Sequence, residues 1–405
     1  MKSYLSKHPK LYYCMIILSC CLFMAGAIGI TANTLGVFMS AIASDMHTGI
    51  GSITMIITIM SLSSAFFAPI LSRLLALYPI NQIMSVGILI NVLSLVFLSQ
   101  SHHLMFMYVF ALKLGIGNCC FSLIPVTLIL NHWFYKNNGL ISGFCISFSG
   151  LTASIASILV THLIAQIGWR HALLICAAVV FLLAFPPAFF IIHQNPRELG
   201  ILPYGILEET EEISKEESYS TQKGLFLTLL LYAAIVSFMT SFNPNISAFG
   251  NSVGFSAPIC AYMVSAAMIS NVGSKLILGM LVDRFNAEFA NTIMIIVSAI
   301  GFLVLCFVNV NEPVFAIAGT FLFGCIFSAN AAGIPLLIKQ SAGRNNYVAY
   351  YSKISVFSSI AYAIGASCIG FSYDIFHSYH FIFGVMLALV LINLCSLLRL
   401  HKMKK

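Results

Sequence analysis

The feature that most constrains this chain is an apolar run of about 20 or more residues, long enough to cross roughly 30 Å of hydrocarbon, that recurs along its whole length. The 405 residues are 60% hydrophobic and 8% charged, and the mean hydropathy is +0.98. No water-soluble fold of this length exposes such a composition. The pattern therefore predicts an all-α membrane protein whose twelve transmembrane helices lie at 12–39, 48–70, 81–99, 104–130, 139–164, 171–192, 225–249, 257–281, 289–309, 313–338, 347–371 and 379–398.

The basic residues of the loops predict how these helices are oriented, because lysine and arginine accumulate on the cytoplasmic side. If both termini are cytoplasmic, the outside loops hold only Arg170, and the inside segments hold fifteen basic residues: Lys2, Lys7, Lys10, Arg73, Lys136, Arg197, Lys215, Lys223, Arg284, Lys339, Arg344, Arg399, Lys402, Lys404 and Lys405. We therefore expect a multi-pass protein of a bacterial plasma membrane (the inner membrane). The net charge of +7 is then explained by basic residues that orient the protein and attract anionic lipid of the inner leaflet, and it does not indicate nucleic-acid binding.

One long loop divides the chain into two halves. Residues 193–224 include the polar acidic run EETEEISKEES, which predicts a cytoplasmic linker between a six-helix bundle at 1–192 and a second bundle at 225–405. The halves resemble repeats, as in many secondary transporters. APILSRL at 68–74 aligns with GMLVDRF at 279–285. Prolines also take comparable places in GNCCFSLIP and CIFSANAAGIP, which predicts two pseudo-symmetric bundles.

Three lysines lie inside predicted spans: Lys113, Lys275 and Lys353. On insertion scales each costs about 2.5–3.5 kcal/mol at a helix centre, so each is a candidate for a functional site. Every acidic residue falls in a loop or at a helix edge, so the lysines have no carboxylate partner within the spans. The pattern predicts that the missing partner is a ligand and that this ligand is an anion.

Depth in the membrane separates the three lysines. Lys275 precedes Asp283 by eight residues, and Lys353 follows Asn345 by eight on an oppositely directed helix. At 1.5 Å per residue both lie about 12 Å from the cytoplasmic end, whereas Lys113 lies nearer the outside. The alternative is snorkelling, in which the aliphatic stem carries the charge to the interface, but a stem of about 6 Å does not span that depth.

Four asparagines also lie within spans: Asn33, Asn118, Asn271 and Asn330. Each amide could bind a carboxylate or instead join neighbouring helices by hydrogen bonds. We take Asn33 and Asn330 as candidate substrate ligands and leave the structural alternative open for all four.

Several stretches together resemble a known family. They are NTLGVFMSAIASDM at 33–46, WFYKNNGLISGFCISFSG at 133–150, GWRHAL at 168–173, NPRELGILPYG at 195–205 and VGFSAPICAYMVSAAMISNVGSKLILGMLVDRF at 253–285. The pattern resembles the major facilitator superfamily, and within it the branch of the oxalate–formate antiporters and monocarboxylate porters. The likeness covers nearly the full chain and implies a facilitator fold.

The resemblance also implies roles for particular residues. In that branch a basic residue on the eighth helix and a lysine on the eleventh bind the carboxylates of the substrate, and Lys275 and Lys353 match those places. The loop motif that stabilises the alternating conformations corresponds to Arg73 in the first half and to Asp283 and Arg284 in the second.

The sequence departs from the family pattern at three places. Ser72 stands where an aspartate is usual, and Asn286-Ala287-Glu288 replaces a glycine and basic residues, which predicts weaker loop contacts. Lys275 stands where arginine is common. An ammonium lacks the bidentate fork that fits a carboxylate, so we expect weaker selectivity for a planar dicarboxylate.

These features together predict a secondary active transporter that exchanges small mono- or dicarboxylates by alternating access, as a monomer in the lipid bilayer. The counter-ion is a second anion or a proton. Two alternatives stay open: an efflux pump for neutral or anionic toxins or metabolites, and a proton-coupled monocarboxylate symporter. We expect no enzymatic activity, cofactor or metal, because the sequence has no nucleophile elbow, phosphate loop or metal-ligand cluster.

Overall fold

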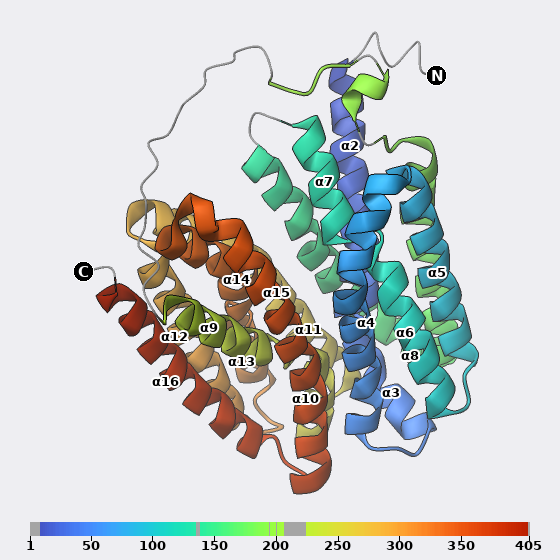
Figure 1. Cartoon of the computed structure of the whole chain (residues 1–405). Coiled ribbons are helices and arrows are strands. Elements are labelled where there is room, and N and C mark those ends of the chain that lie inside the picture. Colours follow the sequence, from blue (N-terminus) through green and yellow to red (C-terminus); the bar gives the residue numbers. More distant parts are fainter. Residues whose placement is uncertain (1–8, 135–137, 194, 200, 206–223, 404–405) are drawn as a thin grey trace. The chain divides into compact units, whose positions relative to one another are not determined.

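The computed structural model describes residues 9–134, 138–193, 195–199, 201–205 and 224–403 (Figure 1). Within these residues the chain is helical, and the one β-bridge joins Phe134 to Tyr204. Contacts between residues divide the chain into two compact units. Unit 1 comprises 1–34, 62–156 and 163–214, and unit 2 comprises 35–61, 157–162 and 215–405. Segments 35–61 and 157–162, which precede the predicted linker, therefore pack with the C-terminal half of the chain.

Unit 1 is built from the first half of the sequence. Two helices run through both units, α4 (Ile50–Leu77) and α8 (Asn138–Phe190). The others within unit 1 are α2 (Pro9–Met24), the π-helix η1 (Ala25–Asn33), α5 (Ile80–Gln100), α6 (Leu104–Cys119), α7 (Leu123–Trp133) and the 3-10 turn η2 (Pro196–Leu199).

Unit 2 contains the second half and α3 (Leu35–Asp45). Its further elements are α9 (Leu225–Thr240), η3 (Asn243–Asn245), α10 (Ile246–Val253), α11 (Ala257–Arg284), α12 (Ala287–Cys306), α13 (Pro313–Phe323), α14 (Ile326–Ser328), the π-helix η4 (Ala329–Gly333), α15 (Ile334–Phe376) and α16 (His380–Lys402).

Local sequence explains several helix boundaries in unit 2. Proline lies in the first turn of α11 and α13, where its missing N–H costs no hydrogen bond. Asn286 caps α12, because its side-chain oxygen accepts a hydrogen bond from the backbone N–H of Phe289 at 2.7 Å. Gly254 ends α10 with a φ of 98°, a left-handed conformation that favours glycine.

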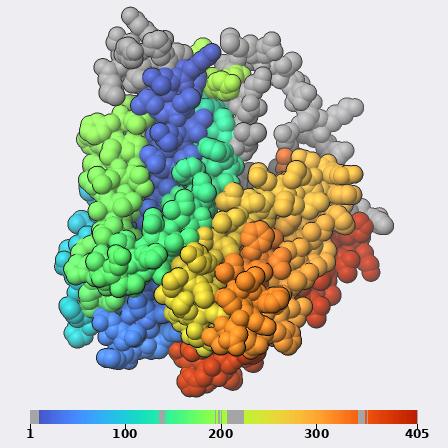
Figure 2. All heavy atoms as spheres, turned by 180° about the vertical axis from the view of Figure 1, so that it is seen from behind, coloured from blue at the N-terminus to red at the C-terminus, as the bar shows by residue number. Residues whose placement is uncertain are grey.

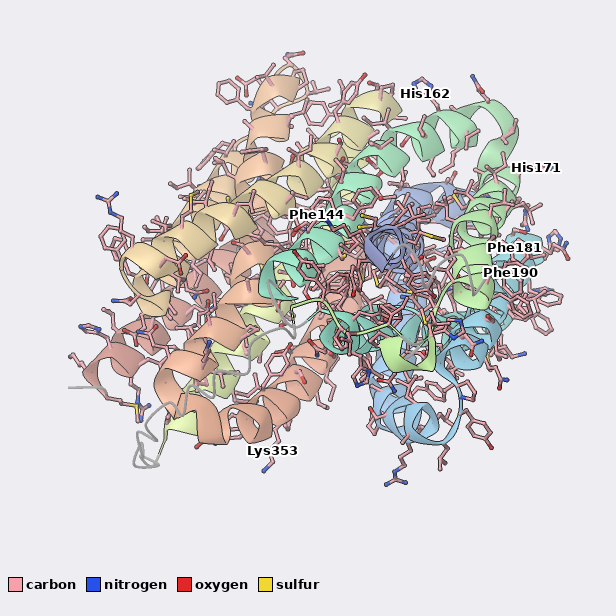
Figure 3. All side chains as sticks on the ribbon, turned by 90° about the horizontal axis from the view of Figure 1, so that it is seen from above. Phe144, His162, His171, Phe181, Phe190 and Lys353 are labelled. Carbon is pink, nitrogen blue, oxygen red and sulfur yellow. The ribbon has the colours of Figure 1, made fainter. Side chains whose placement is uncertain are left out.

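The predicted number of spans agrees with the described helices. Eleven of them are long and apolar enough to cross a membrane, and one of these, Ile141–Phe190, has 50 residues, enough for two crossings. Gly168 interrupts this helix with a φ of 79° and a ψ of 160°. Figure 3 shows the chain turning between His162 and His171. The interruption falls between the predicted fifth and sixth spans, as expected for two separate crossings. The prediction of an all-α membrane protein is confirmed.

Glycines bring the third and fourth spans of each half close together. A Cβ on Gly117 of α6 would lie 2.6 Å from the backbone nitrogen of Asn91 in α5. A Cβ on Gly301 of α12 would lie 2.5 Å from the backbone nitrogen of Phe323 in α13. Small residues allow this close approach of membrane helices. The third and fourth spans therefore approach closely in both halves, through a glycine of the fourth span in the first half and of the third span in the second.

Apolar side chains cover the outer faces of the helices. Along α8, the ring centroids of Phe181 and Phe185 lie 4.8 Å apart, and those of Phe185 and Phe189 lie 5.8 Å apart. Figure 3 shows Phe181 and Phe190 pointing away from the helix. Figure 2 shows part of the side-chain surface over α11 to α13, in yellow to orange. Exposed rings and aliphatic chains on membrane-length helices fit a lipid environment.

The first part of the predicted linker is bound to unit 1. Trp133 donates its ring N–H to the carbonyl of His193 at 2.9 Å, and its own carbonyl accepts the N–H of Tyr204 at 2.9 Å. The Tyr13 hydroxyl donates to the carbonyl of Leu202 at 2.6 Å. Residues 206–223, with the acidic run, lie outside the described residues. The division at 193–224 stays a prediction.

Candidate functional site

The first and fourth spans of each half are interrupted near their middles. In unit 1, the first span contains η1, and the fourth breaks between α6 and α7, just before Pro125. In unit 2, the seventh breaks at η3, which contains Pro244, and the tenth breaks between α13 and α14 and then continues as η4. Discontinuous helices form the binding sites of many transporters, and π-helical turns are frequent at functional sites. These interruptions mark one candidate region for the site, and the in-span lysines mark another.

In unit 1 the interruption gathers buried polar groups. The Thr31 hydroxyl donates to the carbonyl of Gly26 at 2.8 Å and lies 3.5 Å from the Oδ1 of Asn91. The Oδ1 of Asn118, near the end of α6, is buried without a hydrogen-bond partner among the described residues. Asn33 is the last residue of η1 and is half-buried. The predicted ligand Asn33 therefore lies on a π-helical turn.

In unit 2 the second predicted amide also lies on a π-helix. The Nδ2 of Asn330 donates to the Thr240 hydroxyl at 3.0 Å, and its Oδ1 accepts from the Ser237 hydroxyl at 3.3 Å. Both partners belong to α9, so Asn330 ties η4 to that helix. These two hydrogen bonds join helices, which is the structural alternative that the sequence left open. They use both the nitrogen and the oxygen of the Asn330 amide.

Lys275 lies on the buried face of α11. It follows Asn271 by one turn and Met268 by two, and these residues are 6% and 0% exposed. The exposed stripe of α11 runs through Tyr262, Ile269 and Leu276, which are 48–66% exposed. Lys275 itself is half-buried and makes no hydrogen bond or ion pair with the residues that the structure describes. Its charge is therefore turned away from the lipid-facing side of its helix and is unneutralised.

Asn271 carries a second unpaired group on the same face. Its Oδ1 is buried and has no hydrogen-bond partner in the described part of the chain. Ser274, also buried, donates to the backbone carbonyl of Asn271 at 3.4 Å. An ammonium group and a free amide oxygen one helical turn apart form a polar patch, which can bind an anion that also carries a hydrogen-bond donor.

Lys353 has a different environment. It is exposed and lies in line with Phe357, Ile364 and Phe371 of α15, which are 51%, 48% and 41% exposed. Figure 3 shows its side chain pointing away from the helix. Lys275 and Lys353 are thus both in unit 2 but on helix faces of opposite character. Their joint role at one site stays a prediction.

Lys113 is exposed on α6, on a face shared with Phe106 and Val109, which are 58% and 43% exposed. Its Nζ lies 5.6 Å from the ring centroid of Phe110, within the range of a cation–π contact. A lysine among exposed apolar side chains fits the snorkelling alternative, in which the stem follows the helix surface and the charge lies near the interface.

The predicted loop motif is exposed on both halves. Arg73, Asp283 and Arg284 are all exposed, and the Arg284 guanidinium lies 5.7 Å from the ring centroid of Phe285. Asp283 forms no ion pair with any residue in the described part of the chain. The role of these three residues in the conformational change stays a prediction.

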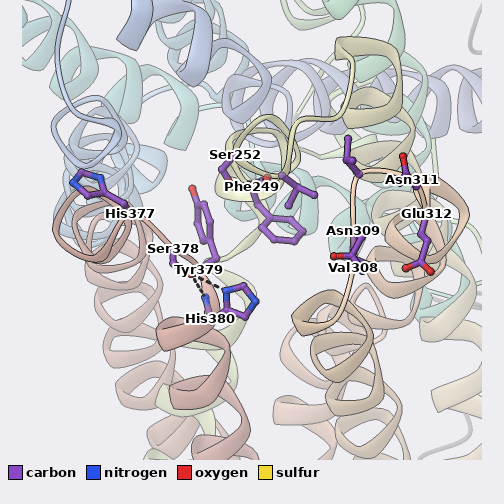
Figure 4. Close-up of a pocket in the computed structure, with 12 residues that line it drawn as sticks. Phe249, Ser252, Val308, Asn309, Asn311, Glu312, His377, Ser378, Tyr379 and His380 are labelled. Carbon is purple, nitrogen blue, oxygen red and sulfur yellow. Dashed lines mark hydrogen bonds between the residues drawn. The ribbon is translucent and has the colours of Figure 1, made fainter.

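A separate cavity of about 640 Å³ lies among the loops of unit 2 (Figure 4). Its walls include Phe249, the loop at 308–312 and the turn at 377–380. His380 lies 2.7 Å from the Ser378 hydroxyl at its edge. None of the predicted site residues lines this cavity, so it is not the lysine site.

Sequence reasoning missed one buried polar pair, which lies next to η4. Tyr232 donates to the Oδ1 of Asn291 at 2.8 Å, both fully buried, and no spacing in the sequence indicates this pair. The helix interruptions do have a signal, since proline lies at or next to three of them.

Comparisons with known proteins agree with the fold. The family model of the Major Facilitator Superfamily matches residues 18–366 and, separately, 225–404. YhjX of Escherichia coli K12, described as an uncharacterized MFS-type transporter, is 22% identical over 340 residues, which are 83% of this chain and 81% of YhjX.

Two solved structures share the fold at low identity. The nucleoside transporter NupG has a TM-score of 0.74 at 11% identity, covering 96% of this chain and 99% of NupG. A bacterial homologue of the human lysosomal transporter Spinster, inward-facing and occupied, has a TM-score of 0.71 at 13% identity, covering 96% of each chain. The chain belongs to the Major Facilitator Superfamily and is a multi-pass membrane transporter, not an enzyme.

Proposed function

We propose that this transporter carries small organic anions with a carboxylate group, by alternating access and in exchange for a second anion. The observation that carries the proposal is Lys275, a cation on the buried face of a membrane helix with no acidic partner in the described chain. A buried charge without a partner is costly in a membrane. A bound carboxylate removes that cost, and the resemblance to the carboxylate antiporter branch supports the same class of substrate.

The polar patch around Lys275 favours a monocarboxylate or a hydroxy acid. Lys353 lies on an exposed apolar face, so Lys275 is the one in-span lysine on a buried face among the described residues. One ammonium neutralises one carboxylate. The free Oδ1 of Asn271 can accept a hydrogen bond from a hydroxyl group on the same substrate.

Exchange follows from the same charge. In the empty carrier the Lys275 ammonium is unpaired, and its desolvation raises the energy of any occluded intermediate. A bound anion neutralises the site, so the loaded carrier changes conformation more readily than the empty one. A difference of this kind favours exchange over net transport.

Anion binding to the purified protein tests the proposal. Oxalate, formate, pyruvate, lactate and malate are titrated against the wild type in detergent, with the unfolding temperature as the readout. A ligand at about 100 times its Kd stabilises the folded state by about 2.7 kcal/mol. Lys275→Gln removes the charge and a charged hydrogen bond worth about 1.5–3 kcal/mol, so we expect affinity to fall about 10- to 100-fold.

Lys339→Gln is the matched control, because Lys339 is an exposed lysine of α15 and is not one of the three candidate lysines. We expect it to bind like the wild type. If no anion stabilises the protein, or if Lys275→Gln binds as tightly as the wild type, the carboxylate proposal is wrong and efflux of neutral compounds becomes the better hypothesis.

A further inference from the structure

Within unit 2, the start of α4 packs along the end of α15 in an antiparallel seam. Both segments belong to this unit, although more than 300 residues separate them in the sequence. The seam joins a helix of the first sequence half to a helix of the second. It lies at the helix ends that the distribution of lysine and arginine places outside the cell.

One carboxylate holds the outer end of the seam. The Oδ1 of Asp374 accepts the backbone N–H of Ile50 at 3.0 Å, and its Oδ2 accepts the backbone N–H of Gly51 at 2.8 Å. These are the first two residues of α4, whose N–H groups have no partner within the helix. The positive end of the helix dipole and two charge-assisted hydrogen bonds therefore act on the same carboxylate.

Glycines allow this approach. A Cβ on Gly49 would lie 2.5 Å from the Oδ2 of Asp374, and a Cβ on Gly51 would lie 2.8 Å from it. On the other helix, a Cβ on Gly370 would lie 2.6 Å from the Thr54 hydroxyl. Any larger residue at these positions would push the helices apart. The close contact between α4 and α15 therefore depends on the three glycines.

Hydroxyl groups extend the seam by two further turns. The Thr58 hydroxyl donates to the carbonyl of Ala363 at 2.5 Å and lies 2.6 Å from the Ser367 hydroxyl. Next to it, Asn245 of η3 donates to the carbonyl of Ala366 at 3.2 Å. The seam therefore contains hydrogen bonds at its end and at its middle, and the carboxylate of Asp374 is its one charged group among the described contacts.

We infer that Asp374 is a latch that keeps this side of the transporter closed. Alternating access rocks one sequence repeat against the other, so opening toward the outside separates the start of α4, in the first half, from α15, in the second. It therefore breaks both hydrogen bonds to Asp374 and removes the carboxylate from the helix N-terminus. Loss of the carboxylate lowers the stability of the closed state relative to the open one. The inference depends on alternating access within the family and not on the identity of the substrate.

The test measures how often the seam opens. Thr54 is fully buried in the seam, so Thr54→Cys introduces a thiol that reacts only when the helices part. The parent also carries Cys368→Ser, because Cys368 is exposed on α15. Intact cells are treated with a membrane-impermeant maleimide, and the labelling rate of the introduced thiol is followed. We expect Asp374→Asn to raise this rate about tenfold.

Two further variants make the result specific. Asp374→Ser keeps a small neutral acceptor near the helix end, and we expect it to raise labelling as well. Glu312→Gln removes another exposed acidic side chain of unit 2 that takes no part in the seam, and we expect it to label like the parent. Labelling at the parent rate in both Asp374 variants would overturn the latch, as would an equal rise in Glu312→Gln.

Discussion

At Lys275 a membrane helix bears a cation on the face turned from lipid, next to an amide oxygen that nothing in the described chain satisfies. At Asn330 the opposite holds, since both amide atoms bind α9. The two asparagines Asn271 and Asn330 look alike in the sequence, as in-span amides. Their partners divide them into an amide whose oxygen has no partner in the described chain and an amide that joins helices.

This division predicts opposite effects of one substitution. Asn330→Leu leaves Ser237 without its acceptor, and we expect a loss of about 1 kcal/mol, in the range measured for interhelical hydrogen bonds in membranes. Asn271→Leu removes a buried oxygen that has no partner among the described residues, so we expect the stability to stay within about 0.5 kcal/mol or to rise. Thermal unfolding of both variants in the same detergent checks this. A loss in Asn271→Leu as large as that in Asn330→Leu would contradict the assignment.

At the scale of elements, close glycine contacts join the third and fourth spans of each half. Contacts of this kind place the interrupted spans against a continuous neighbour, α5 in unit 1 and α12 in unit 2. The interrupted segments have fewer helical hydrogen bonds of their own, so the neighbouring helix supplies the packing that keeps each break in place.

Alanine at these glycines should destabilise each unit by a similar amount. Gly117→Ala and Gly301→Ala each place a methyl group 2.5–2.6 Å from a backbone nitrogen, and overpacking of this kind costs about 1–3 kcal/mol. Gly143→Ala and Gly384→Ala are matched controls, because no heavy atom lies within 4 Å of the added Cβ. We expect lower unfolding temperatures for the first pair alone. Equal unfolding temperatures in all four variants would show that the glycine contacts do not hold the spans together.

At the scale of the whole molecule, the sequence predicts the number and places of the helices, because the thickness of the bilayer sets a length that apolar runs must reach. It does not predict which face of a helix is buried. Lipid is as apolar as a protein core, so hydropathy does not separate the lipid-facing side of a membrane helix from its core-facing side. For this reason Lys275 and Lys353 look equivalent in the sequence and differ in the structure.

Other features depend on contacts that are distant along the chain. The carboxylate of Asp374 binds α4 across more than 300 residues, and a single sequence places it in an outside loop. The π-helical turns η1 and η4 are packing adjustments for which the sequence offers only nearby glycine, alanine and proline. The repeat, by contrast, is visible in the sequence as matched motifs and in the structure as close glycine contacts between the third and fourth spans of each half.

Counterflow in proteoliposomes tests the proposed transport most directly. Vesicles that contain an unlabelled anion, or none, receive the same anion with a label, for the wild type, Lys275→Gln and Lys353→Gln. We predict that one carboxylate enters preloaded vesicles faster than empty ones and that Lys275→Gln abolishes this uptake. Loss of uptake in Lys353→Gln as well would place both lysines at the site. Uptake that is equal in wild type and Lys275→Gln, or no uptake of any carboxylate, would contradict an anion site at Lys275.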